Sequence, residues 1–135
     1  MNTSKISATQ TALRDAALKV QENAYAPYSN FKVGAAILAS NGKIYAGCNV
    51  ENAAYPLGTC AEGGAISAMI ADGATSINEV FIVGSADQAC YPCGGCRQKL
   101  AEFSQPEVKV TMQSHSGQYE ILTVGELLPA SFSLN

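Results

Sequence analysis

The sequence predicts an α/β protein, a three-layer α/β/α sandwich built around one mixed sheet of about five strands. Three observations support this fold class. The chain has 135 residues, the usual size of one domain, so we expect a single domain over residues 1–135. Helix and strand patterns alternate along it in the order α, β, β, α, β, α, β, β. Residues 79–84 form a continuous apolar strand, which is typical of strands covered on both faces.

The first element is an amphipathic helix. Ser7 and Gln10 have the spacing of a capping box, which marks a helix start. Apolar residues then recur at helical intervals as far as Ala24. We therefore expect this helix to end near Pro27, because proline cannot continue it.

A β-hairpin follows the helix. Residues 33–39 are a short apolar run, and the Asn-Gly pair at 41–42 is a strong hairpin signal. Residues 43–51 then form the returning strand. Since side chains alternate across a strand, Asn49 and Glu51 are expected to project together from the same face.

Helices and strands alternate in the second half of the chain. A helix-forming segment over residues 59–71 stops at the Asp-Gly pair 72–73, which is a typical helix end. The remaining elements are a strand over 79–84, a helix from Pro92 to about Phe103, strands over 107–112 and 118–124, and a helical turn over 126–128.

The composition narrows the class of ligand. Charged residues make up 14% of the chain, and its net charge is -3, so tight binding to nucleic acid or to anionic membranes is not expected. No apolar run is long enough to span a bilayer. Residues 1–7 are polar and lack the apolar core of a secretory signal, which predicts a cytoplasmic protein. Small neutral molecules remain as candidate ligands.

Three of the five cysteines have the spacing of a metal site. Clustered cysteines in a reducing compartment more often hold metal or do chemistry than form disulfides. Cys60 and Cys93 lie where predicted helices begin, and the unpaired N–H groups there favour the thiolate. Cys96 lies three residues beyond Cys93 and faces the same side. Three thiolates would leave the fourth position of a tetrahedral Zn²⁺ open, as in catalytic sites, where zinc makes hydroxide available near neutral pH.

Glu62 is the candidate general acid/base. It lies two residues beyond Cys60, close enough to exchange a proton with water at the metal without binding the metal itself. Zinc-dependent nucleobase deaminases combine cysteine ligands, such a glutamate and a Pro-Cys-x-x-Cys signature. Three alternatives remain: a capping box between Thr59 and Glu62, a thioredoxin-like redox pair, and a closed four-thiolate zinc site that includes Cys90.

Short motifs over nearly the whole chain carry a family resemblance. They are residues 25–31, 33–36, 47–58, 60–62, 92–98 and 126–129, together with Phe132. In these segments the sequence resembles the small, homotetrameric type of cytidine deaminase. The resemblance implies a hydrolase of pyrimidine salvage, with one zinc ion per chain, that deaminates cytidine and 2'-deoxycytidine to the uridines and releases ammonia.

The resemblance also implies a role for each matching residue. Cys60, Cys93 and Cys96 would hold zinc, and Glu62 would shuttle protons. The substrate contacts would be Phe31 packed on the pyrimidine, Asn49 and Glu51 at the ribose 3'-hydroxyl, the Ala61 backbone at the base, and Phe132 inserted from a neighbouring subunit.

One position departs from the family pattern. The family commonly has Arg directly after the catalytic glutamate, where it donates to the zinc thiolates, but this chain has Gly63. Three thiolates on Zn²⁺ leave a net negative charge that must be offset. We expect Arg97, together with backbone N–H donors, to supply this compensation, and Gly63 to open space beside the metal.

Two other functions stay open besides nucleoside deamination. One is deamination of a cytosine-containing antibiotic that resembles blasticidin S, although Asn49 and Glu51 favour a ribose ligand. The other is a non-catalytic, zinc-stabilised assembly protein, for which Gly63 is the hint. The net charge of -3 argues against a deaminase that edits polynucleotides, because such enzymes need a positively charged groove for the nucleic-acid backbone.

Overall fold

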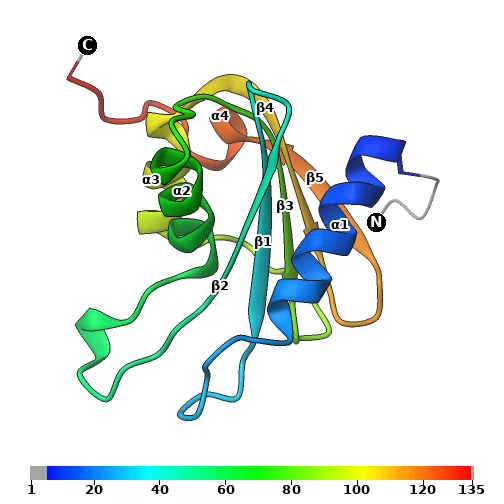
Figure 1. Ribbon diagram of the computed structural model, residues 1–135, viewed down its shortest axis with the longest axis vertical. Coiled ribbons are helices and arrows are strands. Elements are labelled where there is room, and N and C mark those ends of the chain that lie inside the picture. Colours follow the sequence, from blue (N-terminus) through cyan, green and yellow to red (C-terminus); the bar gives the residue numbers. More distant parts are fainter. Residues whose placement is uncertain (1–5, 135) are drawn as a thin grey trace.

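Helices cover both faces of a five-stranded sheet in the computed structural model, which describes residues 6–134 (Figure 1). Helix α1 (Ala8–Gln21) lies on one face. The other face carries α2 (Ala61–Ala71), α3 (Gly94–Glu102) and the short α4 (Val124–Leu127). The predicted three-layer α/β/α fold is confirmed. Residues 1–5, which carry most of the expectation about a secretory signal, lie outside the described residues.

The sheet is mixed, as predicted. Its strands are β1 (Val33–Ala39), β2 (Ile44–Cys48), β3 (Ile77–Gly84), β4 (Ser104–Gln113) and β5 (Tyr119–Thr123). They are arranged in the order β2-β1-β3-β4-β5. Only β3 and β4 run parallel, and α3 forms the crossover between them. The start of α3 therefore follows the carboxyl end of β3, where α/β proteins commonly place their ligands.

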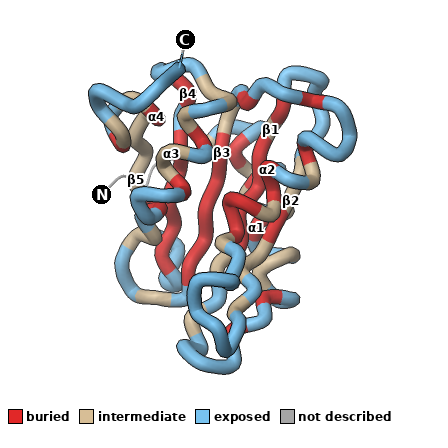
Figure 2. The backbone as a smooth tube through the Cα atoms, turned by 90° about the vertical axis from the view of Figure 1, so that its left-hand side faces the viewer, coloured by how far each residue is buried: buried red, intermediate tan, exposed pale blue. Residues whose placement is uncertain are grey.

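The central strands contribute to two cores, one on each face of the sheet. Val80 and Ile82 of β3 belong to the core under α2 and α3, whereas Phe81 and Val83 belong to the core under α1. Buried residues accordingly run along β1, β3 and β4 (Figure 2). This double burial explains why the strand is continuously apolar from Val80 to Val83. Among residues 6–134, no helix has both the length and the apolarity needed to cross a bilayer.

Helix α1 begins as predicted but ends earlier. The Ser7 hydroxyl accepts from the Gln10 backbone N–H at 3.1 Å, and the Gln10 side chain accepts from Ser7 N at 2.9 Å. The predicted end near Pro27 is wrong, because the helix stops at Gln21. The segment before Pro27 instead pairs with the chain beyond β2, where Tyr25 N donates to Asn49 O at 3.0 Å.

Strand β2 is shorter than predicted. It ends at Cys48, and beyond it only Val50 makes isolated bridges, to Tyr25 and Thr59. Asn49 and Glu51 therefore do not share one face of a regular strand. Within β2, Gly47 permits close approach of α2, since an added Cβ would lie 2.4 Å from Ala65 N. This contact sets how near the start of α2 comes to the sheet.

Candidate active site

Helix α2 begins with a cysteine cap. Cys60 is the N-cap residue, and its Sγ accepts a hydrogen bond from Gly63 N at 3.3 Å. The alternative in which Thr59 and Glu62 form a capping box is therefore wrong, because Thr59 is not the cap. Glu62 is left free for another role, in the first turn of the helix, where the dipole favours a negative charge.

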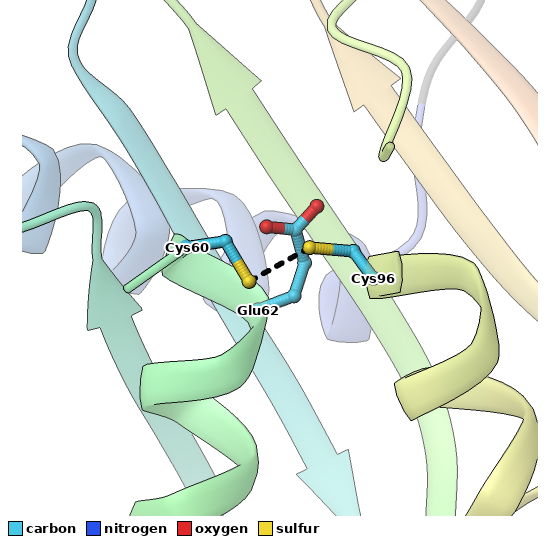
Figure 3. A group of neighbouring side chains, drawn as sticks. All are labelled: Cys60, Glu62 and Cys96. Carbon is cyan, nitrogen blue, oxygen red and sulfur yellow. Dashed lines mark hydrogen bonds between the residues drawn. The ribbon is translucent and has the colours of Figure 1, made fainter. Parts of the chain in front are cut away.

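Two cysteines and a glutamate meet between the starts of α2 and α3 (Figure 3). The Cys96 Sγ donates to the Cys60 Sγ, and the two sulfur atoms lie 2.7 Å apart. The Glu62 carboxyl lies beside them, so that one ligand atom from each of the three residues lies within 4.8 Å of the others. Cys96 is 2% exposed, so its thiol is shielded from bulk water, whereas Cys60 is partly exposed.

The sulfur pair shares one proton. The hydrogen bond from Cys96, with smaller contributions from the N–H of Gly63 and the ammonium of Lys99, lowers the pKa of Cys60 to about 5. The same hydrogen bond, together with burial, raises the pKa of Cys96. The arrangement is therefore a thiolate at Cys60 that accepts from a thiol at Cys96.

Glu62 is a buried carboxyl with a raised pKa. The side chain is 4% exposed, and burial is the main cause of the shift. The negative charge on Cys60 raises the pKa of Glu62 further. A carboxyl group whose pKa is moved toward neutral pH can both accept and release a proton under physiological conditions, as a general acid/base must.

A cavity of about 150 Å³ opens on this cluster. Four further residues from the predicted site line it, namely Phe31, Asn49, Ala61 and Cys93. Four residues that the sequence did not single out as substrate contacts also line it, namely Val33, Cys90, Tyr91 and Pro92. The structure thus brings most of the predicted site residues to one cavity.

Cys93 and Cys90 lie beside the cluster of Cys60, Glu62 and Cys96 but not within it. Cys93 is the exposed N-cap of α3, and hydrogen bonding with its side chain contributes to the raised pKa of Cys96. Burial raises the pKa of Cys90 to about 11, so Cys90 is a thiol at neutral pH.

Gly84 makes room for one wall of the cavity. A Cβ at this position would lie 2.7 Å from Cys90 Cβ and 3.3 Å from Phe31 Cζ. Only a glycine at the end of β3 therefore allows the Phe31 ring and the Cys90 side chain to pack this closely against its backbone. No pattern in the sequence reveals this contact, because it joins three distant segments.

Asn49 connects the end of β2 to the start of β1. Its Oδ1 accepts from Val33 N at 2.8 Å, and its Nδ2 donates to Phe31 O at 2.8 Å. A carboxamide has a second N–H and a second lone pair, so Asn49 can still bind a ligand in the cavity. Asn49 therefore positions Phe31 as well as lining the site.

Glu51 lies in a neighbouring cavity. This cavity of about 390 Å³ is lined by Tyr28, Ser29, Val50, Glu51, Asn52, Tyr55, Gly58 and Thr59. The Glu51 carboxylate accepts from the Ser29 hydroxyl and from the backbone N–H groups of Tyr28 at 3.0 Å and Ser29 at 3.2 Å. These hydrogen bonds, the Ser29 hydroxyl first, lower the pKa of Glu51. The expected pair of Asn49 and Glu51 is thus divided between two cavities.

The structure corrects the role expected for Arg97. Its Nε donates to Pro92 O at 2.8 Å and its Nη1 to Leu127 O at 3.0 Å, so the guanidinium holds backbone carbonyls and not thiolates. The cation at the cluster is Lys99, whose Nζ donates to Cys60 Sγ at 3.7 Å. The sequence contained a signal for Lys99, because it follows Cys96 by three residues and so shares its helix face.

Phe132 is separate from both cavities. It is 71% exposed, and the hydrogen bond that holds its backbone comes from Gln98 Nε2, at 3.3 Å. Its ring therefore contributes nothing to the site of its own chain.

The chemistry of the donor set fits zinc. Thiolate sulfur favours Zn²⁺ over the hard cations Mg²⁺ and Ca²⁺, and a thiolate and a thiol that share one proton are suited to bind a dication in its place. A buried carboxyl within reach supplies either another ligand or a base. The cavity beside the cluster leaves space for a substrate.

Comparisons with known proteins agree with this chemistry. Residues 7–112 match the family described as the cytidine and deoxycytidylate deaminase zinc-binding region. A cytidine deaminase from Sporosarcina psychrophila is 44% identical over 115 residues, which cover 85% of each chain. A second, from Halalkalibacterium halodurans, is 38% identical over 117 residues, which cover 87% of this chain and 89% of that protein.

Solved structures give the same result. The crystal structure of cytidine deaminase from Burkholderia pseudomallei is similar to this chain with a TM-score of 0.86 and 42% identity, covering 90% of this chain and 98% of that one. The crystal structure of cytidine deaminase from Mycobacterium tuberculosis is similar with a TM-score of 0.80 and 35% identity. The match covers 92% of this chain and 97% of that one. These relatives do not favour the two alternatives, an antibiotic deaminase and a non-catalytic assembly protein.

Proposed function

The chain belongs to the cytidine and deoxycytidylate deaminase family, and on this premise we propose that it hydrolyses cytidine and 2'-deoxycytidine to uridine and 2'-deoxyuridine. In this reaction a water oxygen bonds to C4 of the pyrimidine, the C4–N bond breaks, and ammonia leaves. The observation that carries the proposal is the buried Glu62 carboxyl beside the Cys60 and Cys96 sulfur atoms.

One zinc ion per chain would be held by Cys60, Cys93 and Cys96. The convergence of Cys60 and Cys96 supports two of these ligands, and the position of Cys93 on the wall of the same cavity supports the third. When bound, zinc activates a water molecule as a nucleophile near neutral pH. Arg97 would keep the Pro92 carbonyl, and with it the start of α3, in place.

Glu62 would move the protons of the reaction. It takes one proton from the attacking water and delivers it to N3 of the base, and then takes the second proton from the new C4 hydroxyl and delivers it to the departing amino group. Its raised pKa supports this role, because a carboxyl with an ordinary pKa is a poor proton donor at neutral pH. Its burial supports it too, since a carboxyl that is 4% exposed has little contact with bulk water.

The remaining predicted residues would orient the nucleoside. Phe31 would pack on the pyrimidine, and the backbone of Ala61 would contact the base; both line the small cavity. Asn49 and Glu51 would bind the ribose 3'-hydroxyl. Consecutive residues, Thr59 and Cys60, line the larger and the smaller cavity, which supports a ligand that extends from one into the other.

A homotetramer would complete each site. Phe132 would enter the site of a neighbouring subunit, and its 71% exposure on its own chain supports this. Other exposed apolar side chains, Tyr55 at 79% and Leu57 at 70%, form surface that a subunit contact would cover.

The substrate would be a free nucleoside and not a polynucleotide, which the net charge of -3 supports. We place the reaction in pyrimidine salvage and in the cytoplasm. A single domain over residues 1–135 would carry it out. None of the five cysteines is in a disulfide, which suits a reducing compartment.

The test follows conversion of cytidine to uridine by the purified, zinc-loaded protein. Wild type should release one ammonia per uridine, and Glu62→Gln should lower kcat by about 10²- to 10⁴-fold, the usual contribution of a general acid/base. Asp72→Asn is the matched control, because Asp72 caps the other end of α2, where it accepts from Lys43. Turnover near the wild-type rate in Glu62→Gln would refute the role of Glu62, and no turnover in wild type would refute the activity.

A further inference from the structure

Lys99 reaches the metal cluster from α3. Its Nζ donates to the Sγ of Cys60 at 3.7 Å, across the gap between α3 and α2. Cys96 precedes it by three residues, so both side chains lie on the face of α3 that looks toward the start of α2. The same face therefore presents one sulfur and one positive charge to Cys60.

Gly63 leaves the space in which this contact forms. A Cβ at position 63 would lie 3.2 Å from Cys60 Sγ and 3.3 Å from Lys99 Nζ. Both distances are tighter than ordinary van der Waals contact, so a Cβ at this position would push the sulfur or the ammonium aside by a few tenths of an ångström. Gly63 also donates its own N–H to Cys60 Sγ at 3.3 Å. Gly63 thus affects the Cys60 sulfur in two ways. Its N–H donates a hydrogen bond to the sulfur, and its lack of a side chain leaves room for Lys99 beside it.

The cluster needs a positive charge. Three thiolates carry more negative charge than one Zn²⁺ ion balances, and the Glu62 carboxyl lies in the same cluster. Among residues 6–134, Lys99 is the one basic residue whose side chain donates to a cysteine sulfur. The others are Arg14, Lys19, Lys32, Lys43, Arg97 and Lys109, and their hydrogen bonds and ion pairs, where they have them, go to oxygen atoms.

We propose that Lys99 is a positioning residue of the zinc site, whose ammonium offsets the charge of the Cys60 thiolate and holds its sulfur in place, and that Gly63, by lacking a side chain, leaves the room for this contact. The inference rests on the proposed zinc-dependent function. Lys99 does not line the cavity, so it acts through Cys60 and not on the substrate.

Zinc affinity is the direct test. The holoenzyme is equilibrated with a chromophoric chelator, and the zinc dissociation constant is compared among variants. Lys99→Met should weaken zinc binding by about 10- to 100-fold, the range found for partners of metal ligands. Lys99→Arg should restore most of the affinity. Lys19→Met removes the same charge from α1, on the other face of the sheet, and should bind zinc like wild type.

Three results would overturn the role of Lys99. One is wild-type zinc affinity in Lys99→Met. Another is a failure of Lys99→Arg to bind zinc better than Lys99→Met. The third is a melting temperature of metal-free Lys99→Met more than about 5 °C below wild type, which would indicate a general structural role. If wild type itself binds no zinc, the proposed function fails instead, so the two failures are distinguishable.

Kinetics separate positioning from substrate contact. In fully zinc-loaded enzyme, Lys99→Met should lower kcat and leave KM for cytidine unchanged, because Lys99 is outside the cavity. An increase in KM with unchanged kcat would contradict action through Cys60.

A double-mutant cycle tests the part of Gly63. Gly63→Ala is made in wild type and in Lys99→Met, and zinc affinity is measured in all four proteins. The contact of the new Cβ with Cys60 is the same in both backgrounds, so the difference isolates Lys99. Gly63→Ala should weaken zinc binding more when Lys99 is present than in Lys99→Met. An equal loss of zinc affinity in the two backgrounds would show that Gly63 does not leave room for the Lys99 contact.

Discussion

The Sγ atoms of Cys60 and Cys96 lie 2.7 Å apart, although 36 positions separate the two residues in the chain. Cys60 caps α2 and Cys96 lies in the first turn of α3, so a metal ion at this point joins the starts of two helices. Both helices pack on the same face of the sheet. Binding of zinc therefore couples the chemistry of the site to the packing of that layer.

The ligand set can be tested by zinc content. Cys93→Ala should lose most of its bound zinc, because three thiolates are proposed to hold the ion. Cys90→Ala is the matched control, since Cys90 lines the same cavity but is not one of the three proposed ligands. It should retain one zinc ion per chain by mass spectrometry of metals. Equal loss in both variants would instead support a four-thiolate site.

Asn49 should contribute to stability as well as to substrate binding. Asn49→Ala removes the hydrogen bonds to Val33 N and Phe31 O and should lower the free energy of unfolding by about 1–3 kcal/mol, measured by urea denaturation. Asn52→Ala removes a local contact with Ala54 N in an exposed turn, and it should change stability by about 0.5 kcal/mol or less. Equal effects of the two substitutions would argue against the connecting role of Asn49.

Glu51 should titrate below the ordinary range of a glutamate, chiefly because the Ser29 hydroxyl donates to it. Its folded pKa is lower than its unfolded pKa, so its stabilising effect is present above the unfolded pKa and is lost as pH falls through the folded pKa. Ser29→Ala should raise the pKa of Glu51, as followed by NMR of the carboxyl carbon. Asp72, whose pKa is lowered by Tyr45 and Lys43, should titrate unchanged in this variant. An unchanged pKa of Glu51 would refute the assigned cause.

Phe132 should affect substrate binding through a neighbouring subunit. Light scattering should give a mass about four times the 14.0 kDa of one chain. Phe132→Ala should raise KM for cytidine by about 10- to 100-fold, since burying a phenylalanine side chain stabilises a complex by roughly 1.5–3 kcal/mol. Leu134→Ala, in the same tail and 92% exposed, should leave KM unchanged. A fully active monomer would be incompatible with the shared site.

Local patterns were enough to predict the elements of the fold. The capping pair Ser7 and Gln10, the hairpin glycine Gly42 and the strand Val33–Ala39 all lie where the sequence predicts them. Each depends on residues within a few positions of one another. The helix end near Pro27 and the length of β2 were wrong because long-range pairing decides them, through the hydrogen bond between Tyr25 and Asn49.

The residue types of the site were also predictable, but their partners were not. The sequence alone predicted a zinc-type constellation of Cys60, Glu62, Cys93 and Cys96 at two helix starts, since thiolate and carboxylate chemistry depends on residue type and spacing. The structure brings Cys60, Glu62 and Cys96 together and places Cys93 on the wall of the same cavity. Only the tertiary structure decided that Lys99 and not Arg97 meets Cys60. Residues 97 and 99 are separated by roughly 200° around a helix. Which of them faces α2 depends on how α3 packs in the crossover between β3 and β4, and no local pattern contains that information.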